Sequence, residues 1–291
     1  MVNDTFYLCH TSCDILNAGT LESYLTTVAD WVEAHPYDVV TILIANGDCR
    51  NVRNFIAPIQ SSGLGPYLDE PSKIPMGIGD WSTLSYMTLT RKRVVLFMHY
   101  ETNQQEVPYI LDEFSQMWET PFSPTNIAFP CTVQRPPGLN REQALERMYL
   151  MNHNLNVEIS YLGVNILIPN TAYINVTNGV TGERSLGRST NSCTGKPPLI
   201  SPTPTLGGVV EESVDDKNQD DWGGPPSWLL VDYYNCGSPI DGSVFEVAAM
   251  HNNVTYNRKC CGLVQSLAPM TLRRPGLAAF LVVAIAYSNS L

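Results

Sequence analysis

Polar residues that could carry chemistry stand where runs of strand-forming residues end. His10 follows "FYLC" near the start of the chain, and Asp232 lies in "WLLVDYYN", far downstream. In parallel α/β folds, functional groups gather at the carboxyl ends of the strands. A histidine on an early strand and an aspartate on a late one therefore favour acid–base chemistry. The other polar residues at expected strand ends are Asn46, Asp48, His99, Arg135, Asn152 and His153.

Each of these residues also has a structural interpretation, which the sequence leaves open. A histidine at the end of a strand is often a hydrogen-bonded structural residue. Asp48 could cap a turn, and Arg135 could be a surface charge beside Pro136.

The signatures of common nucleophile, nucleotide and metal sites are missing. The sequence has no GxSxG, no Walker A loop, no HExxH and no GxGxxG between a strand and a helix. It also has no dense cluster of carboxylates of the kind that holds Ca²⁺ or Mg²⁺. We therefore expect no metal and no cofactor.

Alternating helix and strand patterns position these residues. "GTLESYLTTVADWVEAHP" predicts a helix that Thr20 caps and Pro36 ends. "VVTILIA", residues 39–45, is a continuous apolar run typical of a strand buried in a parallel sheet. Further strands are expected at residues 5–10, 94–100, 129–135, 148–155 and 227–235, and further helices near residues 52–60, 81–93, 107–118, 140–147 and 243–253.

Repeated β-then-α units of this length predict a parallel α/β architecture, either an open sheet or a (β/α) barrel. The pattern breaks at residues 194–221, which are rich in Pro, Gly and acidic residues. We expect this segment to be a flexible surface insertion. The chain then divides into one α/β domain at residues 1–262 and a spacer with an apolar tail at residues 263–291.

The composition narrows the range of partners. The chain has 291 residues, a formal net charge of −11 and 44% hydrophobic residues, as expected of a globular protein with a sizeable core. A nucleic-acid partner is excluded because it would require a basic surface. The acidity also argues against electrostatic docking on anionic lipid.

Cysteines and glycosylation sequons favour the secretory pathway. None of the eight cysteines forms a CxxC pair, so structural disulfides fit them better than a zinc site. Disulfides persist in oxidising compartments. The three sequons are Asn3-Asp-Thr5, Asn175-Val-Thr177 and Asn253-Val-Thr255. We expect an extracellular or cell-surface glycoprotein.

The two ends of the sequence differ in the targeting features that they show. The first residues lack the basic start and apolar stretch of a signal peptide. The apolar run from Leu277 to Tyr287 is shorter than the roughly 20 residues that span a bilayer. This tail could be a GPI-attachment signal, which would associate the protein with a membrane or cell wall, or a buried terminal helix or strand. Both interpretations stay open.

Several of these segments resemble one family. "LCHTSCDILNAGTLESYLTTVADWVEAHPYDVVTILIANGD", "VPYILDEFSQMWETPF", "RMYLMNHNL", "WLLVDYYN" and "FEVAAMHNNVTY" are similar to fungal secreted proteins of the PLC-like phosphodiesterase superfamily. These proteins are related to bacterial phosphatidylinositol-specific phospholipase C. The resemblance implies an irregular (β/α) TIM-type barrel and metal-independent cleavage of a phosphodiester or phospholipid-like small molecule, hence a role in lipid metabolism.

The resemblance also assigns roles to three residues. His10 matches the family's second histidine, the general acid, and Asp232 matches the aspartate that orients the first histidine. Arg135 is the remaining strand-end cation for a phosphate. The first barrel strand, its catalytic histidine and the family's phosphate-binding arginine have no counterpart in these residues.

Three functions follow from this comparison. The first is a phospholipase C-like phosphoric diester hydrolase whose activity is impaired, because losing one acid–base partner typically costs about 10²- to 10⁴-fold in rate. The second is a non-catalytic secreted or surface-anchored barrel protein. A glycerophosphodiesterase-like barrel is a third hypothesis, but it needs a set of metal-binding carboxylates that the sequence lacks. A further hypothesis is that the sequence is a mis-started gene model or a fragment.

Overall fold

The computed structural model describes residues 5–10, 12–161, 164–195, 221–256 and 281–286. The chain forms two compact units, residues 1–117 with 276–291 (unit 1) and residues 118–275 (unit 2). Each unit is described by itself. The predicted insertion at 194–221 lies almost wholly outside the described residues, as does most of the predicted spacer and tail at 263–291.

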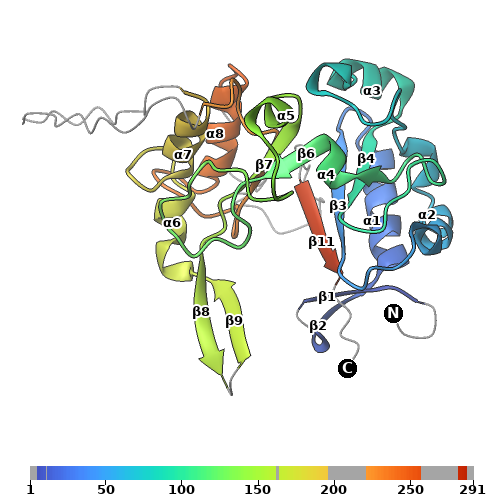
Figure 1. The fold of residues 1–291 in the computed structure, drawn as a ribbon, viewed down its shortest axis with the longest axis horizontal. Helices are drawn as coiled ribbons and strands as arrows, with labels where there is room; N and C mark the ends of the chain where they lie inside the picture. Colours follow the sequence, from blue (N-terminus) through green and yellow to red (C-terminus); the bar gives the residue numbers. More distant parts are fainter. Residues whose placement is uncertain (1–4, 11, 162–163, 196–220, 257–280, 287–291) are drawn as a thin grey trace, which may run out of the picture. The chain divides into compact units, whose positions relative to one another are not determined.

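A four-stranded parallel sheet forms the centre of unit 1 (Figure 1). Its order is β11-β3-β4-β5, with bounds Leu281–Ala286 (β11), Val40–Asn46 (β3), Val94–Met98 (β4) and Leu111–Asp112 (β5). Both long apolar runs of this part of the sequence become central strands, and every residue of β4 is buried. The prediction of buried parallel strands is confirmed here. β11 agrees with the interpretation of the apolar tail as a terminal strand, whereas a GPI signal stays a prediction.

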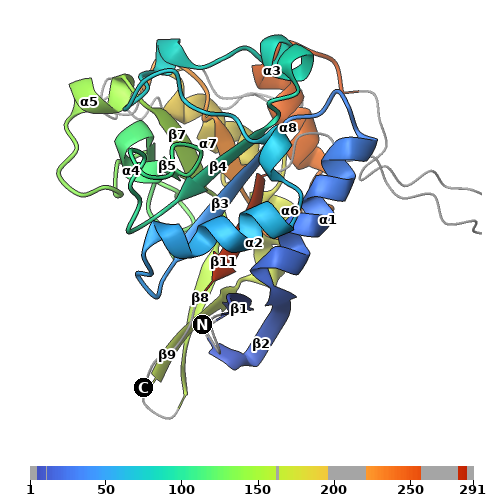
Figure 2. The ribbon, with the colours of Figure 1, turned by 90° about the vertical axis from the view of Figure 1, so that its right-hand side faces the viewer.

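The helices of unit 1 cover one face of this sheet. α1 (Leu21–Ala34) begins where Thr20 Oγ1 accepts a hydrogen bond from the Ser23 backbone N–H, 3.1 Å away, as the sequence predicts. It packs beside α2 (Ile56–Ser61) and the short helix η1 (Val52–Phe55) (Figure 2). The shared core includes Leu25 and Val32 of α1, Phe55 and Ile59 of η1 and α2, Ile42 and Ile44 of β3, and Leu96 and Met98 of β4.

The opening segment is a strand, but it is not a parallel strand of the central sheet. β1 (Tyr7–His10) pairs antiparallel with β2 (Ser12–Thr20), and His10 lies opposite Ser12. A disulfide between Cys9 and Cys13 joins the two strands. Because this bridge closes a loop of four residues, the chain turns back on itself directly after His10. The expectation of a β-then-α barrel strand here is therefore wrong.

The helices predicted later in unit 1 are shorter than expected. α3 (Leu84–Thr90) fills only the middle of the expected 81–93 helix, because Thr83 caps it and Arg91 ends it in a left-handed conformation. α4 (Glu113–Gln116) fills only part of the expected 107–118 helix. The residues on either side of α4 form the short strands β5 (Leu111–Asp112) and β6 (Met117–Glu119). The short helices η2 (Gly65–Tyr67) and η3 (Ile78–Asp80) lie between β3 and β4, and η4 (Thr171–Tyr173) follows β9 (Val164–Pro169) in unit 2.

Unit 2 contains a three-stranded sheet with the order β10-β7-β6. The strands are β6 (Met117–Glu119), which starts at the unit boundary, β7 (Met148–Asn152) and β10 (Trp228–Leu230). β7 and β10 are parallel, with Leu150 opposite Trp228 and Asn152 opposite Leu230. The sequence therefore predicts both strands, although β10 is shorter than expected.

The strand expected at residues 129–135 is absent, and this prediction is wrong. Only Arg135 pairs there, in an isolated antiparallel bridge with Glu119. Pro130 has no N–H to give to a ladder, and Cys131 is held by a disulfide to Cys193. The segment therefore runs as a loop until it reaches β6.

Helices pack around the sheet of unit 2. They are α5 (Arg141–Leu145), α6 (Ile174–Thr177), α7 (Leu186–Cys193) and α8 (Ser243–His251), and the sequence predicts α5 and α8. α7 approaches the preceding loop so closely that a Cβ on Gly187 would lie 1.9 Å from the Val180 carbonyl oxygen. Met151, Leu186 and Val247 join β7, α7 and α8 in one core.

An antiparallel hairpin of β8 (Asn156–Tyr161) and β9 (Val164–Pro169) was not expected from the sequence. It begins four residues after β7 ends and projects from the rest of unit 2 (Figures 1 and 2).

The observed fold is mixed α/β with parallel sheets, which confirms the predicted class. Within the described residues, each sheet is open, and no ladder closes either one into a barrel. The single barrel domain at 1–262 stays a prediction. No helix in the described ranges combines the length and apolar character needed to cross a membrane.

Candidate functional site

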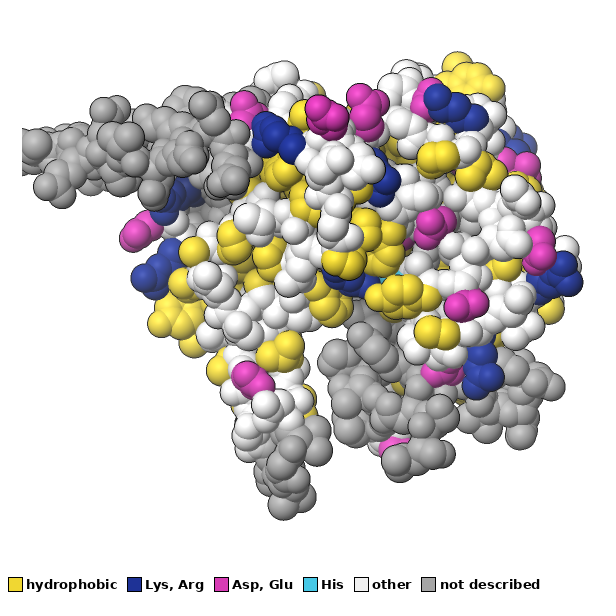
Figure 3. Space-filling view, viewed as in Figure 1, with side chains coloured by type: hydrophobic (Ala, Val, Ile, Leu, Met, Phe, Trp, Pro, Cys, Tyr) yellow, Lys and Arg dark blue, Asp and Glu magenta, His cyan; other side chains and the backbone are white. Residues whose placement is uncertain are grey.

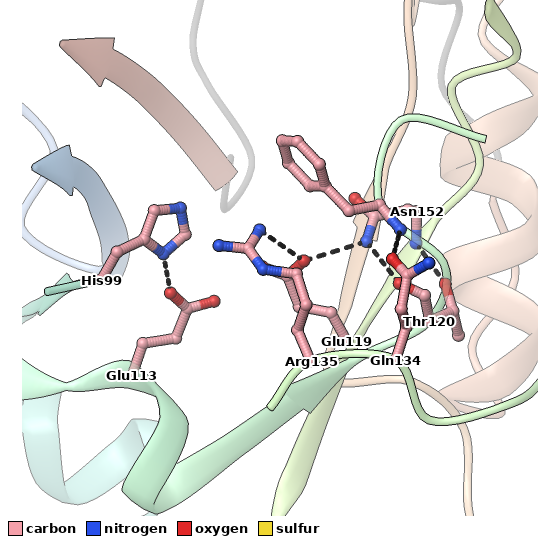
Figure 4. Close-up of polar contacts among 8 residues, drawn as sticks. His99, Glu113, Glu119, Thr120, Gln134, Arg135 and Asn152 are labelled. Atoms are coloured by element: carbon pink, nitrogen blue, oxygen red, sulfur yellow. Dashed lines mark hydrogen bonds and ion pairs between the residues drawn. The ribbon is translucent and has the colours of Figure 1, made fainter. Parts of the chain in front are cut away.

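Buried polar side chains gather at strand ends in each unit (Figure 4). In unit 1 the group is His99 with Glu113. In unit 2 it is Glu119 with Arg135 and Asn152.

His99 directly follows β4, and its imidazole Nδ1 is hydrogen-bonded to Glu113 Oε2 (Figure 4). Both side chains are buried, Glu113 completely. The ring of Phe114 stacks on His99, with centroids 5.6 Å apart and planes 2° apart. His99 comes directly after β4, where the chain leaves the sheet. Glu113 is the first residue of α4, and this helix returns its carboxylate to the His99 imidazole.

A carboxylate partner on Nδ1 places the proton on that nitrogen, so that Nε2 carries the lone pair. This is how proteins orient a histidine that accepts a proton or binds a metal. Unit 1 therefore offers an oriented imidazole at this position.

Glu119 is the centre of the group in unit 2. It ends β6, and its side chain is only 2% exposed. Arg135 Nη1 lies 3.1 Å from Glu119 Oε2, and Asn152 Nδ2 donates to the same oxygen at 3.2 Å. The Arg135 guanidinium also lies over the Phe122 ring, 4.5 Å from its centroid. Backbone hydrogen bonds between residues 119 and 135 hold the two side chains together.

Asn152 is fixed by several hydrogen bonds that it donates, and it keeps one unused acceptor. Its Nδ2 also donates to the Thr120 carbonyl oxygen at 3.0 Å, and its backbone N–H donates to Thr120 Oγ1 at 2.8 Å. The side chain is 2% exposed. Its Oδ1 has no hydrogen-bond partner among the described residues. A buried acceptor without a donor is costly, and a ligand hydroxyl or ordered water would satisfy it.

His153, the next residue, has a different environment. Its ring is fully buried against Phe129, with centroids 3.6 Å apart, and Nε2 lies 3.1 Å from Ser189 Oγ. Burial lowers the pKa of His153 from 6.5 to about 3. The imidazole is therefore neutral at physiological pH, and the structural interpretation of this histidine is the better one.

Unit 1 also contains a cavity of about 340 Å³ away from β4's end, lined mainly by polar residues from the loops around η3 and α3. Asp69, Glu70 and Asp80 line it, together with Lys92. Lys73 already lies 2.8 Å from Asp80, and burial raises the pKa of Asp69. Three carboxylates beside the two lysines Lys73 and Lys92 leave a net negative charge that would repel a phosphodiester.

Comparison with known proteins places the chain in a family. The family model described as PI-PLC X 1 matches residues 1–206, well over half of the chain. The chain belongs to the PI-PLC X domain family. The resemblance seen in the sequence is confirmed.

Two relatives come from Arthroderma benhamiae. An uncharacterized secreted protein is 54% identical over 268 residues, which cover 92% of this chain and 55% of the relative. A PI-PLC X domain-containing protein 1 is 38% identical over 190 residues, which cover 65% of this chain and 60% of the relative. The chain therefore spans between half and two thirds of the length of these curated relatives. No solved structure matches significantly.

The three residues chosen from the sequence lie in different parts of this PI-PLC X chain. His10 ends β1 in unit 1, and its side chain is outside the described residues. Arg135 and Asp232 belong to unit 2. Asp232 is half-buried and lies two residues after β10, where Asn178 Nδ2 donates to its backbone carbonyl oxygen at 2.8 Å. The roles of all three remain predictions.

Glu113 and Glu119 are the site residues that sequence reasoning missed. Both fall in or beside the segment expected to be one helix, and helical carboxylates are usually on the solvent side. The sequence did contain a hint of burial, because Phe114 follows Glu113 and Trp118 precedes Glu119. A short segment with large aromatic residues also suits a brief strand, which can bury the residue at its end.

Proposed function

We propose that the chain is part of a secreted phosphodiesterase of the phospholipase C-like class, and that its unit 2 binds the phosphate ester of a polyol. The observation that carries this proposal is the unused Asn152 Oδ1 beside the Glu119–Arg135 pair. A polyol hydroxyl can donate to Oδ1, and a phosphate is attracted to a guanidinium. Arg135 and Asn152 contact the same oxygen of Glu119, so the proposal places one small ligand beside both.

The cleavage reaction proposed here is metal-independent. His10 acts as the general acid, Asp232 orients a histidine base, and Arg135 attracts the phosphate. Family membership supports these roles. The irregular TIM-type barrel is part of the same proposal.

A non-catalytic role is the second candidate, and one observation favours it. The guanidinium of Arg135 already contacts the buried carboxylate of Glu119, which offsets the positive charge that a phosphate would meet. A secreted or anchored protein that binds a neutral polyol would need only Asn152 and its neighbours.

The proposed extracellular location has two supports. One relative is named a secreted protein, and the structure has disulfides at Cys9–Cys13 and Cys131–Cys193, as the sequence predicts for part of its cysteines. Cys49 and Cys236 are free thiols. A GPI anchor, a wall association and glycosylation remain proposals from the sequence.

Calorimetry with the full chain tests the proposal. Myo-inositol 1-phosphate should bind more tightly than myo-inositol or inorganic phosphate alone, and Arg135→Gln should weaken it by about tenfold, the effect of one charge-assisted hydrogen bond. Arg188→Gln, at an exposed site on α7, is the matched control. Equal affinity for myo-inositol and its phosphate would favour the non-catalytic role. No binding of any of the three would refute the proposed site.

A further inference from the structure

The β8–β9 hairpin of unit 2 has one face made of β-branched apolar residues. Residues directly opposite in an antiparallel pair share a face, and alternate residues do too. Val157 lies opposite Ile168, and Ile159 lies opposite Ile166. These four side chains therefore form a single apolar face, called here the hairpin face. Val157, Ile159 and Ile168 are 40%, 44% and 39% exposed.

The other face of the hairpin is more polar. Glu158 lies opposite Leu167, and Ser160 donates a hydrogen bond to Asn165 across the ladder. Figure 3 shows hydrophobic side chains and no lysine or arginine on the described part of the projecting hairpin. In the two strands Glu158 is the only charged residue.

A two-stranded hairpin is marginally stable in water unless another surface covers it. At its base, Asn156 N–H donates to the Pro124 carbonyl oxygen at 2.8 Å, and Asn170 N–H donates to the Leu155 carbonyl oxygen at 2.8 Å. These bonds hold the base and leave the hairpin face exposed. Apolar side chains gathered on one face of a projecting two-stranded hairpin point to a surface that a partner covers.

We propose that the hairpin face inserts into the surface of an electrically neutral lipid bilayer. The choice of a lipid occupant rests on the proposed function. The hairpin starts four residues after Asn152, at the carboxyl end of β7, so insertion would bring a lipid head group to the side of unit 2 that carries Arg135 and Asn152.

Size and charge favour a lipid surface over a second copy of the chain. Two strands of six residues offer roughly 200 Å² of apolar face, on a rise of about 3.4 Å per residue and a strand spacing of about 4.8 Å. Two such faces bury far less than the roughly 1,200 Å² of a stable interface. A bilayer needs no complementary shape. Because the chain has a net charge of −11 and the hairpin has no basic residue, anionic lipid gains no attraction.

Sedimentation with sucrose-loaded phosphatidylcholine vesicles tests this inference on the full chain. The wild-type chain should sediment with the vesicles equally at 0.1 and about 0.5 M salt, because apolar burial is not screened. Ile159→Ser should raise the lipid concentration for half-binding by about tenfold. Leu167→Ser is the matched control, since Leu167 has a similar exposure of 38% on the other face, and it should change binding less than about twofold.

Ile159→Val keeps the apolar face and should bind like wild type, which separates loss of insertion from loss of folding. Four results would overturn the proposal: no binding to phosphatidylcholine, equal loss in Ile159→Ser and Leu167→Ser, binding confined to anionic vesicles at low salt, or a dimer that Ile159→Ser dissociates without any vesicle binding. Vesicle binding that persists in Arg135→Gln, in which binding of myo-inositol 1-phosphate is weakened, would show that the two sites act separately.

Discussion

The guanidinium of Arg135 lies 3.1 Å from the carboxylate of Glu119, a side chain that is almost wholly removed from solvent. Removing one partner of a buried ion pair leaves the other charge uncompensated, at a cost of about 3 kcal/mol or more. Arg135→Met should therefore lower the free energy of unfolding by about 3 kcal/mol, measured by urea denaturation.

The double variant Glu119→Gln/Arg135→Met removes both charges and should recover more than half of that loss. Arg188→Met, at an exposed position, should change stability by less than about 0.5 kcal/mol. If the double variant is less stable than Arg135→Met, the uncompensated charge of Glu119 is not what destabilises Arg135→Met.

The two disulfides differ in the length of chain that they close. Cys131–Cys193 spans 62 residues, and Cys9–Cys13 spans four. The chain-entropy model gives a loss of about 4 kcal/mol for replacing the first pair by serine and about 2 kcal/mol for the second. Urea denaturation of both serine pairs checks this order. A larger loss from the Cys9–Cys13 pair would contradict it.

His153 makes stability depend on pH. Burial lowers its pKa from 6.5 to about 3, so the unfolded chain binds the proton more tightly than the folded one. The stabilisation is fully present above pH 6.5 and is lost as the pH falls toward 3. Between pH 7 and pH 5 this one group should cost about 2 kcal/mol.

In His153→Gln, residue 153 cannot titrate. The free energy of unfolding of this variant should therefore fall by about 2 kcal/mol less than that of the wild type between pH 7 and pH 5. Denaturation curves of both proteins at several pH values measure the difference. Parallel curves for the wild type and the variant would mean that His153 is solvated or paired in solution.

The His99–Glu113 contact specifies a tautomer. With the carboxylate on Nδ1, the neutral imidazole should carry its proton there. Imidazole ¹⁵N chemical shifts of the full chain measure this directly. Glu113→Gln removes the negative charge and should shift the balance toward the other tautomer. A wild-type His99 protonated on Nε2 alone would contradict the arrangement.

The parts of the fold that depend on strong local patterns could be predicted from the sequence. β3 and β4 are long apolar runs, and α1 has both its cap at Thr20 and its stop at Pro36. The antiparallel turn after His10 could not be predicted, because it depends on which cysteine pairs with Cys9, and eight cysteines permit many pairings.

The candidate site was predictable only in part. Asn152 stands at the end of a strand that the sequence predicts, whereas the strand expected to end at Arg135 is absent. Their shared partner Glu119 lies on a strand of three residues at the end of an apparent helix. Tertiary pairing with residue 135, not local propensity, makes that strand. The β8–β9 hairpin was missed because its alternating pattern has no strong turn signal.

An NMR titration of the full chain with myo-inositol 1-phosphate tests the proposed polyol-phosphate site most directly. We expect saturable shifts of the Arg135 Nε–H and Asn152 Nδ2–H₂ signals, together and with one dissociation constant. Saturable shifts elsewhere in the chain, with both of these signals unmoved, would contradict it.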